Sequence, residues 1–423
     1  MNDIPWQAWA AWLSILAPLA GSLALGVVAL LAPNIPVERS VTRCMQACLV
    51  LALASALAVG IGNGLAGKTG DIFFGDWVIA GEYKIPLTLR IDWLGILFST
   101  MSALFALLVA RFSRTYLHRD PGFFRFFFMM GVFATGAQLV AFAGALDLMF
   151  AGWEAVGLAS TLFIGFFHDR PEPIRSSIRA LVTYRICDAG FLLAVVATHE
   201  WLHSTTLASL DGVSSLPTWQ ATVIATLLMV SAMGKSAQLP FSGWLSRATE
   251  GPTPSSALFY GGISIHLGLF LLLRTWSVID HSPIVEGVGI GIGLLTALYA
   301  ASIARVQPDA KGALAHATLA QVGIIFAEIA AGWTTIALVH LLCHASLRVW
   351  QYLRAPNILH DAHRIGEHAH SGGSWMRAWA PSIERRLCAM GLSRWRLDEA
   401  TDALVAPVLR ISRLLTRATR SKP

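Results

Sequence analysis

Charged residues are scarce in this chain of 423 residues. Asp, Glu, Lys and Arg make up 13% of the sequence, whereas hydrophobic residues make up 55%. Soluble domains carry about 25% charged residues, so this composition excludes an ordinary soluble protein. Apolar stretches of about 20 residues, long enough to cross a bilayer as a helix, recur along most of the sequence.

Cysteine is also scarce. The five Cys residues include no CxxC pair, so we expect neither a disulfide framework nor a sulfur-ligated metal. The sequence also lacks any motif typical of nucleotide, flavin, haem or quinone binding. We therefore expect no cofactor in this chain.

The apolar stretches predict an all-α polytopic membrane protein with about eleven transmembrane helices. The first stretch follows an almost uncharged N-terminus without a small-residue cleavage site, so we expect a retained helix rather than a signal peptide. The predicted spans are 7–32, 43–66, 91–111, 123–144, 147–168, 178–202, 219–238 (continuing broken to about 248), 254–276, 284–305, 311–331 and 333–355.

The basic residues fall unevenly on the two sides of this arrangement. Most of the 31 Lys and Arg residues lie in alternate loops and in the C-terminal tail. Cytoplasmic loops carry the excess of Lys and Arg, which places the N-terminus outside and the C-terminus in the cytoplasm. The net charge of +6 therefore needs no nucleic-acid partner. The opposite side holds only Lys68, Lys84, Arg90 and Arg274.

Two segments outside the spans have a distinct character. Residues 67–90 alternate apolar and polar residues around Gly and Pro, which predicts a short β-hairpin on the outer face. From residue 356 the sequence is polar and His-rich, and from about 374 it becomes amphipathic and basic. We expect a transmembrane domain over 1–355, and over 356–423 a cytoplasmic linker and tail that contacts the membrane surface or a partner. The histidines at 360, 363, 368 and 370 could bind a metal or belong to a solvated linker.

Several ionisable residues interrupt the spans. A charge at the bilayer centre costs at least about 2.5–3.5 kcal/mol, so each needs a partner, a hydrated cavity or a function. These residues are Glu154, Arg185, Asp188, Lys235, His266, His316, Glu328, His340, His344 and Arg348.

Structural roles compete with functional ones for some of these residues. Arg185 and Asp188, three apart on one helical face, could form a structural ion pair. His340 and His344 could be hydrogen-bonded core residues, or a zinc pair without further ligands. Glu328 could simply reach the outer interface.

Glu154 and Lys235 are harder to explain by packing, because apolar residues pack at lower cost. Pro240, five residues after Lys235, removes a backbone hydrogen bond and opens the helix. Broken helices at membrane depth are tolerated where they line water or protein. A Lys facing Glu154 beside such a break is suited to proton transfer, and the histidines could relay protons through water near neutral pH.

At these residues the sequence resembles the antiporter-like, proton-conducting membrane subunits of respiratory complex I and of Mrp-type Na⁺/H⁺ antiporters. The resemblance covers about residues 85–355. It rests on five segments: GWEAVGLASTLFIGFF, YRICDAGFLL, GKSAQLPFSGWLSRATEGPTPSSAL, ARVQPDAKGALAHATLAQVG and HLLCHASLRVWQYL.

The resemblance implies roles for individual residues. Glu154 and Lys235 match the family's Glu–Lys pair of the input half-channel, and Arg185 and Asp188 match the ion pair that modulates it. Lys311 matches a lysine of the tenth helix. The other proton-transfer candidates on these helices are His266, His316, His340, His344 and Arg348.

The sequence also departs from the family. Tyr260 stands where the family usually has histidine, and Arg348 stands at its central lysine. Because arginine is effectively never deprotonated, Arg348 is better suited to a fixed charge than to a proton carrier. No long apolar span follows residue 355, so we expect an antiporter-like fold that lacks the long lateral helix.

Three functions fit these observations. The leading one is a short DAB-type (DabB-like) subunit of the bacterial inner membrane. The resemblance implies that it uses proton entry to drive inorganic carbon accumulation with a large peripheral zinc protein like β-carbonic anhydrase, docked partly through 356–423. The alternatives are a proton-pumping subunit of a complex I-like complex or Mrp-type antiporter, and a membrane scaffold with a vestigial proton path. We expect no chemistry in this chain alone, and zinc only in the partner.

Overall fold

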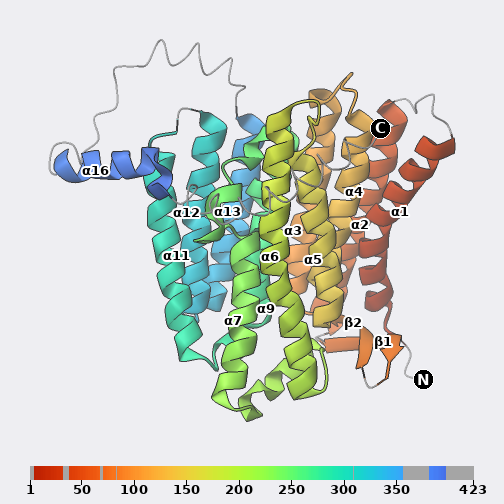
Figure 1. The fold of residues 1–423 in the computed structure, drawn as a ribbon. Helices are drawn as coiled ribbons and strands as arrows, with labels where there is room; N and C mark the ends of the chain where they lie inside the picture. The colour runs from red at the N-terminus through yellow and green to blue at the C-terminus, as the bar shows by residue number, and fades with distance from the viewer. Residues whose placement is uncertain are drawn as a thin grey trace, which may run out of the picture.

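The computed structural model describes residues 4–31, 38–66, 70–81, 83–307, 309–355 and 381–396. Its long helices stand side by side and run roughly parallel to one axis (Figure 1). The long helices are α1 (Trp6–Leu31), α2 (Glu38–Ala66), α3 (Trp93–Tyr116), α4 (Phe123–Phe142), α5 (Leu146–Ile164), α6 (Pro171–Leu202), α7 (Thr218–Lys235), α9 (Ser264–Arg274), α11 (Pro283–Ala304), α12 (Ala310–Ala330) and α13 (Thr334–Arg354).

Shorter elements connect the long helices. A helix at the end of the described chain lies across the axis of the bundle (Figure 1); it is α16 (Pro381–Leu392). The remaining elements are β1 (Gly70–Ala80), β2 (Tyr83–Ile91), the 3₁₀ turns η1 (Leu207–Ser215), η2 (Phe241–Trp244), η3 (Ala248–Glu250) and η5 (Arg394–Arg396), the short helices α8 (Thr253–Ser256) and α10 (Trp276–Ile279), and the π-helical η4 (Ala257–Gly262).

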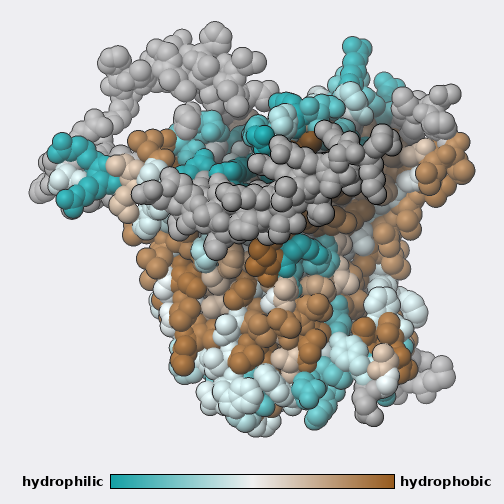
Figure 2. Space-filling view, in the orientation of Figure 1, coloured by the Kyte–Doolittle hydropathy of each residue, from teal (hydrophilic) through white to brown (hydrophobic). Residues whose placement is uncertain are grey.

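The bundle has the composition of a multi-pass membrane protein. Hydrophobic side chains form a band around the middle of the visible face, and hydrophilic ones gather towards its two ends (Figure 2). Among the described residues, nine helices are long and apolar enough to span a bilayer. They are α1 to α6, the continuous stretch Thr253–Arg274, α11 and α12.

The predicted count of eleven spans is therefore not confirmed. Helices also occupy the other two predicted spans, but their composition sets them apart. α7 has only 18 residues and ends on Lys235. α13 carries His340, His344, Arg348 and Arg354. Charged and polar side chains lower the mean hydropathy of both helices.

The predicted hairpin is confirmed. β1 and β2 pair antiparallel from Gly70 opposite Ile91 to Ala80 opposite Tyr83. Trp9 and Trp12 of α1 each contact Phe74 edge-on, with ring centroids 5.8 Å apart. The hairpin thus braces one end of the first helix.

Two pairs of helices approach each other at backbone contact. A Cβ atom placed on Gly136 of α4 would lie 2.7 Å from the carbonyl oxygen of Gly152 on α5. A Cβ on Gly293 of α11 would lie 2.5 Å from the carbonyl oxygen of Gly323 on α12. Small residues at such crossings let membrane helices pack closely.

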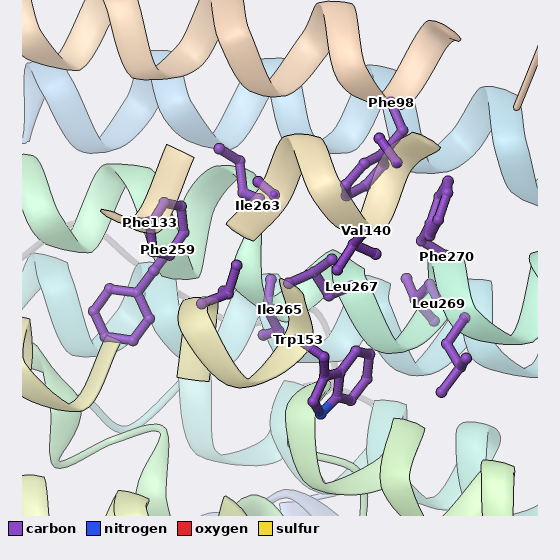
Figure 3. Packing of buried hydrophobic residues seen from close by; sticks show 14 of the residues in the cluster. Phe98, Phe133, Val140, Trp153, Phe259, Ile263, Ile265, Leu267, Leu269 and Phe270 are labelled. Carbon is purple, nitrogen blue, oxygen red and sulfur yellow. The ribbon is translucent and has the colours of Figure 1, made fainter. Parts of the chain in front are cut away.

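The stretch Thr253–Arg274 forms the centre of the bundle, and 94% of its apolar window is buried. Figure 3 shows Ile265, Leu267 and Phe270 of α9 packed among side chains from other helices. Arg274 fixes the end of α9 through an ion pair with Asp92 and a 3.0 Å hydrogen bond to the carbonyl oxygen of Ala141. These contacts hold α9 in a fixed position between its neighbours.

The chain between α7 and α9 is irregular. α7 ends at Lys235, and the backbone of Ala237 is left-handed, with φ of 52°. The chain continues past Pro240 as the turns η2 and η3 rather than as a second helical half. The predicted continuation of a broken seventh helix to about residue 248 is not confirmed, because the helix has already ended before the proline.

The close crossing of α11 and α12 generates a stability prediction. We expect Gly293→Ala to lower the thermal unfolding midpoint of the detergent-purified chain, because overpacking costs about 1–3 kcal/mol. Gly291→Ala on the same helix is the matched control, since nothing in the described ranges lies within 4 Å of a Cβ there. Equal midpoints for the two variants would contradict the close approach.

Candidate functional site

Eight of the ionisable residues inside the bundle gather in two groups. The charged cluster consists of Glu154 on α5, Arg185 and Asp188 on α6, and Lys235 at the end of α7. The histidine cluster consists of His266 on α9 with His340, His344 and Arg348 on α13.

Lys235 is the most deeply buried member of the charged cluster, with 0% of its side chain exposed. Its ammonium nitrogen donates a 3.2 Å hydrogen bond to the carbonyl oxygen of Trp153. It also lies 4.8 Å from the centroid of the Trp153 ring and 4.5 Å from that of the Tyr184 ring. Such contacts with aromatic faces favour a desolvated cation.

The carboxylates are shared unequally between the two cations. Asp188 Oδ2 lies 3.3 Å from Nη2 of Arg185 and 4.0 Å from Nζ of Lys235. Glu154 instead forms an ion pair with Arg185. The carboxylate nearest to Lys235 in these contacts is therefore Asp188. Glu154 contacts Arg185 rather than Lys235 directly, and proton exchange between Glu154 and Lys235 stays a prediction.

The formal charges of the cluster sum to zero, with two carboxylates and two cations. Removing one partner from a buried ion pair costs about 3–5 kcal/mol, because it leaves a charge without compensation. One atom of the cluster nevertheless lacks a contact: Oε1 of Glu154 is buried and has no hydrogen-bond partner among the described residues.

Two residues that sequence analysis missed shape this cluster. Trp153 donates a 2.5 Å hydrogen bond from its indole nitrogen to Asp188, so one residue contacts both the acid and the ammonium. Gly157 makes room for the ammonium, because a Cβ there would lie 2.7 Å from Nζ of Lys235. Gly157 follows Glu154 by three residues, and that spacing on one helical face was the available signal.

The histidine cluster forms where α13 packs against η4 and α9. A Cβ on Gly261 would lie 3.0 Å from the Tyr352 ring and 3.2 Å from the backbone nitrogen of Val349. This close approach brings His344 to His266, with 3.1 Å between Nδ1 of His344 and Nε2 of His266. Arg348 Nε then donates a 3.0 Å hydrogen bond to Nε2 of His344.

His340 faces a different partner. Its Nδ1 lies 3.0 Å from a carboxylate oxygen of Glu328 on α12, and its Nε2 lies 3.2 Å from the side-chain oxygen of Gln321. Its ring centroid is 6.3 Å from that of His344. Glu328 therefore has a partner within the bundle, which its place near the end of a span did not reveal.

The remaining predicted residues lie on α12. Lys311 is in the first turn of the helix and half-buried. His316 is buried, and its Nδ1 lies 3.0 Å from the carbonyl oxygen of Gly312, one turn earlier.

A buried hydrogen bond connects the segments that carry Lys235 and His266. Ser236, directly after Lys235, donates a 2.7 Å hydrogen bond to the carbonyl oxygen of Ile265, directly before His266. This hydrogen bond thus lies next to Lys235 of the charged cluster and next to His266 of the histidine cluster.

Within the described ranges, no three His, Cys, Asp or Glu side chains come together to hold a metal ion. The histidines at 360, 363, 368 and 370, and most of the tail expected to dock a partner, lie outside the described residues. The two clusters bring together carboxylates, an ammonium and imidazoles, which are groups that can exchange protons.

Comparison with protein families finds two matches. Residues 143–383 match the family described as "NADH:quinone oxidoreductase/Mrp antiporter, TM". Residues 77–127 match "NADH-Ubiquinone oxidoreductase (complex I), chain 5 N-terminus". The first match alone covers more than half of the chain and includes both clusters.

Similar curated proteins carry related names. The chain is 30% identical to "NAD(P)H-quinone oxidoreductase chain 5" of Picosynechococcus over 85% of its own length and 55% of the relative's. It is 31% identical to "NADH-quinone oxidoreductase subunit L" of Rhodobacter capsulatus over 73% of its own length and 46% of the relative's. The chain thus spans about half the length of these relatives.

Solved structures share the fold. A chain of the Mrp complex from Dietzia superposes with a TM-score of 0.70 at 24% identity, covering 82% of this chain and 37% of that one. A chain of the archaeal membrane-bound sulfane sulfur reductase superposes with a TM-score of 0.68 at 19% identity, covering 81% of this chain and 70% of that one. The architecture is therefore antiporter-like.

The charge balance of the cluster generates a second prediction. We expect Asp188→Asn to lower the thermal unfolding midpoint in detergent, because it leaves Lys235 with less compensating charge at a cost of about 3 kcal/mol. Adding Lys235→Met should recover much of the loss, since Glu154 and Arg185 then balance. A double variant less stable than Asp188→Asn alone would contradict this charge coupling.

Proposed function

The chain belongs to the family of NADH:quinone oxidoreductase/Mrp antiporter transmembrane subunits, and from this premise we propose that it is a proton-conducting membrane subunit. The observation that carries the proposal is the position of Lys235, fully buried yet 4.0 Å from the carboxylate of Asp188. A tight ion pair would hold the ammonium proton. A loosely paired, buried ammonium is poised to release it.

The proposed path begins at the charged cluster and runs across the bundle. A proton reaching Glu154 exchanges with Lys235, while Arg185 and Asp188 hold the balancing charges. The path continues past the Ser236–Ile265 contact between α7 and α9 to His266. A neutral imidazole has one donor and one acceptor nitrogen, so His266, His344 and His340 are suited to pass a proton along this path in either direction, with Lys311 and His316 on α12 as further candidates.

We propose further that proton movement is coupled to a partner on the cytoplasmic side of the bacterial inner membrane. The described part of the tail contacts the chain that follows the proton site. Arg394 donates a 3.1 Å hydrogen bond to Ser246, in the irregular chain that follows Lys235, and Trp395 donates a 3.2 Å hydrogen bond to Ser302 at the end of α11. A partner that binds the tail would therefore act on the segment beside Lys235.

The identity of that partner is proposed from the resemblance to the short DAB-type subunits. In this proposal the partner is a large zinc protein like β-carbonic anhydrase, and proton entry drives accumulation of CO₂ as bicarbonate. The zinc and the hydration chemistry belong to the partner. The distribution of basic loops supports an N-terminus outside and a C-terminus in the cytoplasm.

A second candidate is favoured by the names of the relatives. The matched proteins are quinone oxidoreductase subunits, and one structural neighbour is an Mrp complex. The chain would then be a proton-pumping subunit of a complex I-like respiratory complex or of an Mrp-type cation/proton antiporter. Both candidates use the same buried lysine, so the partner discriminates between them.

Proton conduction is tested by replacing the buried lysine. We expect Lys235→Met to abolish proton uptake into liposomes that contain the full chain and its copurified partner, measured with a pH-sensitive dye inside the vesicles. Lys84→Met is the matched control, because Lys84 is exposed on the hairpin and its loss should leave uptake unchanged. Full uptake by a folded Lys235→Met variant would rule out the proposed function.

The partner is tested by purification of the tagged chain from its native membrane. We expect a large soluble zinc protein to copurify, identified by mass spectrometry and by zinc content in stoichiometric amount. Copurification of quinone-reductase or cation-antiporter subunits instead would overturn the inorganic-carbon proposal and favour the second candidate.

A further inference from the structure

The hydrogen bonds of the histidine cluster determine which ring nitrogens of His344 and His266 carry a proton. Nε of Arg348 carries a hydrogen and lies 3.0 Å from Nε2 of His344. A guanidinium only donates, so Nε2 of His344 accepts and carries no proton. A doubly protonated imidazole has no lone pair to offer, so His344 is neutral with its proton on Nδ1.

The same argument extends to the next ring. Nδ1 of His344 lies 3.1 Å from Nε2 of His266. Because Nδ1 of His344 is the donor, Nε2 of His266 accepts, and the proton of neutral His266 sits on Nδ1. That nitrogen is buried and has no hydrogen-bond partner in the described part of the chain.

Arg348 keeps the protons of both rings in these positions, and its side chain can move away from His344. Its Nη1 donates a 2.7 Å hydrogen bond to the side-chain oxygen of Gln351, and the side chain is only partly buried. The guanidinium can therefore break its bond to His344 and keep the one to Gln351. It cannot carry a proton itself, because arginine stays protonated.

We propose that Arg348 is a positioning residue that fixes one tautomer in His344 and in His266 and closes one end of this two-ring relay. Protons pass through the pair only when the guanidinium leaves Nε2 of His344. This inference rests on the proposed proton conduction for its function, but the assignment of tautomers rests on geometry alone.

The proton balance of one passage is explicit. After Arg348 withdraws, a hydronium ion delivers a proton to Nε2 of His344, and the Nδ1–H bond of that ring breaks as its proton moves to Nε2 of His266. The Nδ1–H bond of His266 then breaks and its proton goes to a water molecule. One proton has crossed, and both rings have exchanged tautomers, so both must reset before the next passage.

The tautomers are tested by ¹⁵N NMR of the full chain labelled in histidine, with the His344 signals assigned by their loss in His344→Gln. We expect a protonated Nδ1 and an unprotonated Nε2 on His344 in the wild-type chain. In Arg348→Met we expect a mixture of the two tautomers. Protonation of Nε2 in the wild-type chain would overturn the proposal without any variant.

The closing role is tested by proton uptake into liposomes. We expect Arg348→Met to raise uptake by about tenfold, the change that follows from loss of one hydrogen bond to a charged group. Arg354→Met is the matched control on the same helix, because Arg354 stacks on Trp350 at 4.9 Å and should affect neither uptake nor the His344 signals. Reduced uptake by a folded Arg348→Met variant would overturn the closing role.

Failure of the two proposals can be told apart. If Lys235→Met leaves uptake unchanged, the proposed function fails, and the NMR signals of His344 still decide the tautomers. If uptake depends on Lys235 while the His344 signals are the same in the wild-type chain and in Arg348→Met, the positioning role of Arg348 fails alone.

Discussion

The structure is organised around the burial of one ammonium group at membrane depth. Lys235 has no exposed surface, and a charge in that position costs at least about 2.5–3.5 kcal/mol even on the mildest scales. The fold offsets this cost with a carbonyl oxygen, two aromatic faces and a nearby carboxylate rather than with one tight ion pair. Helices α5, α6 and α7 must therefore keep their mutual rotation and depth.

Much of this site is visible in the sequence because its members are charged residues in apolar stretches. Glu154, Arg185, Asp188 and Lys235 each interrupt a predicted span, and the structure brings all four together. The Arg185–Asp188 contact was predictable from its three-residue spacing. The choice of Arg185 rather than Lys235 as the partner of Glu154 was not, because the sequence does not give the rotation of α5 against α6.

Other features were hidden for a different reason. Trp153 is an aromatic residue in an apolar helix, so nothing in its surroundings signalled its bond to Asp188. The contact of His266 with His344 joins residues 78 positions apart, and only the packing of α13 on η4 and α9 brings them together. The hairpin was predictable because its alternation and turn residues are local. The number of spans was not, because α7 and α13 carry charged and polar residues in place of apolar ones.

The sequence resemblance and the comparisons with known proteins identify the same family. The resemblance implies a particular type of subunit, whereas the comparisons show the family only. The chain spans about half the length of its curated relatives, so the shared part concerns the helices that carry the two clusters. Within that part the chain has its own chemistry. The permanently charged Arg348 beside His344 gives its histidine pair a fixed direction of hydrogen bonding.

The glycine crossings also determine where the molecule can change shape. Helices α4 and α5, like α11 and α12, touch through main-chain atoms, so neither pair can slide without steric clash. Each pair behaves as one stiff unit. Any movement in a working cycle would therefore carry both helices of a pair together.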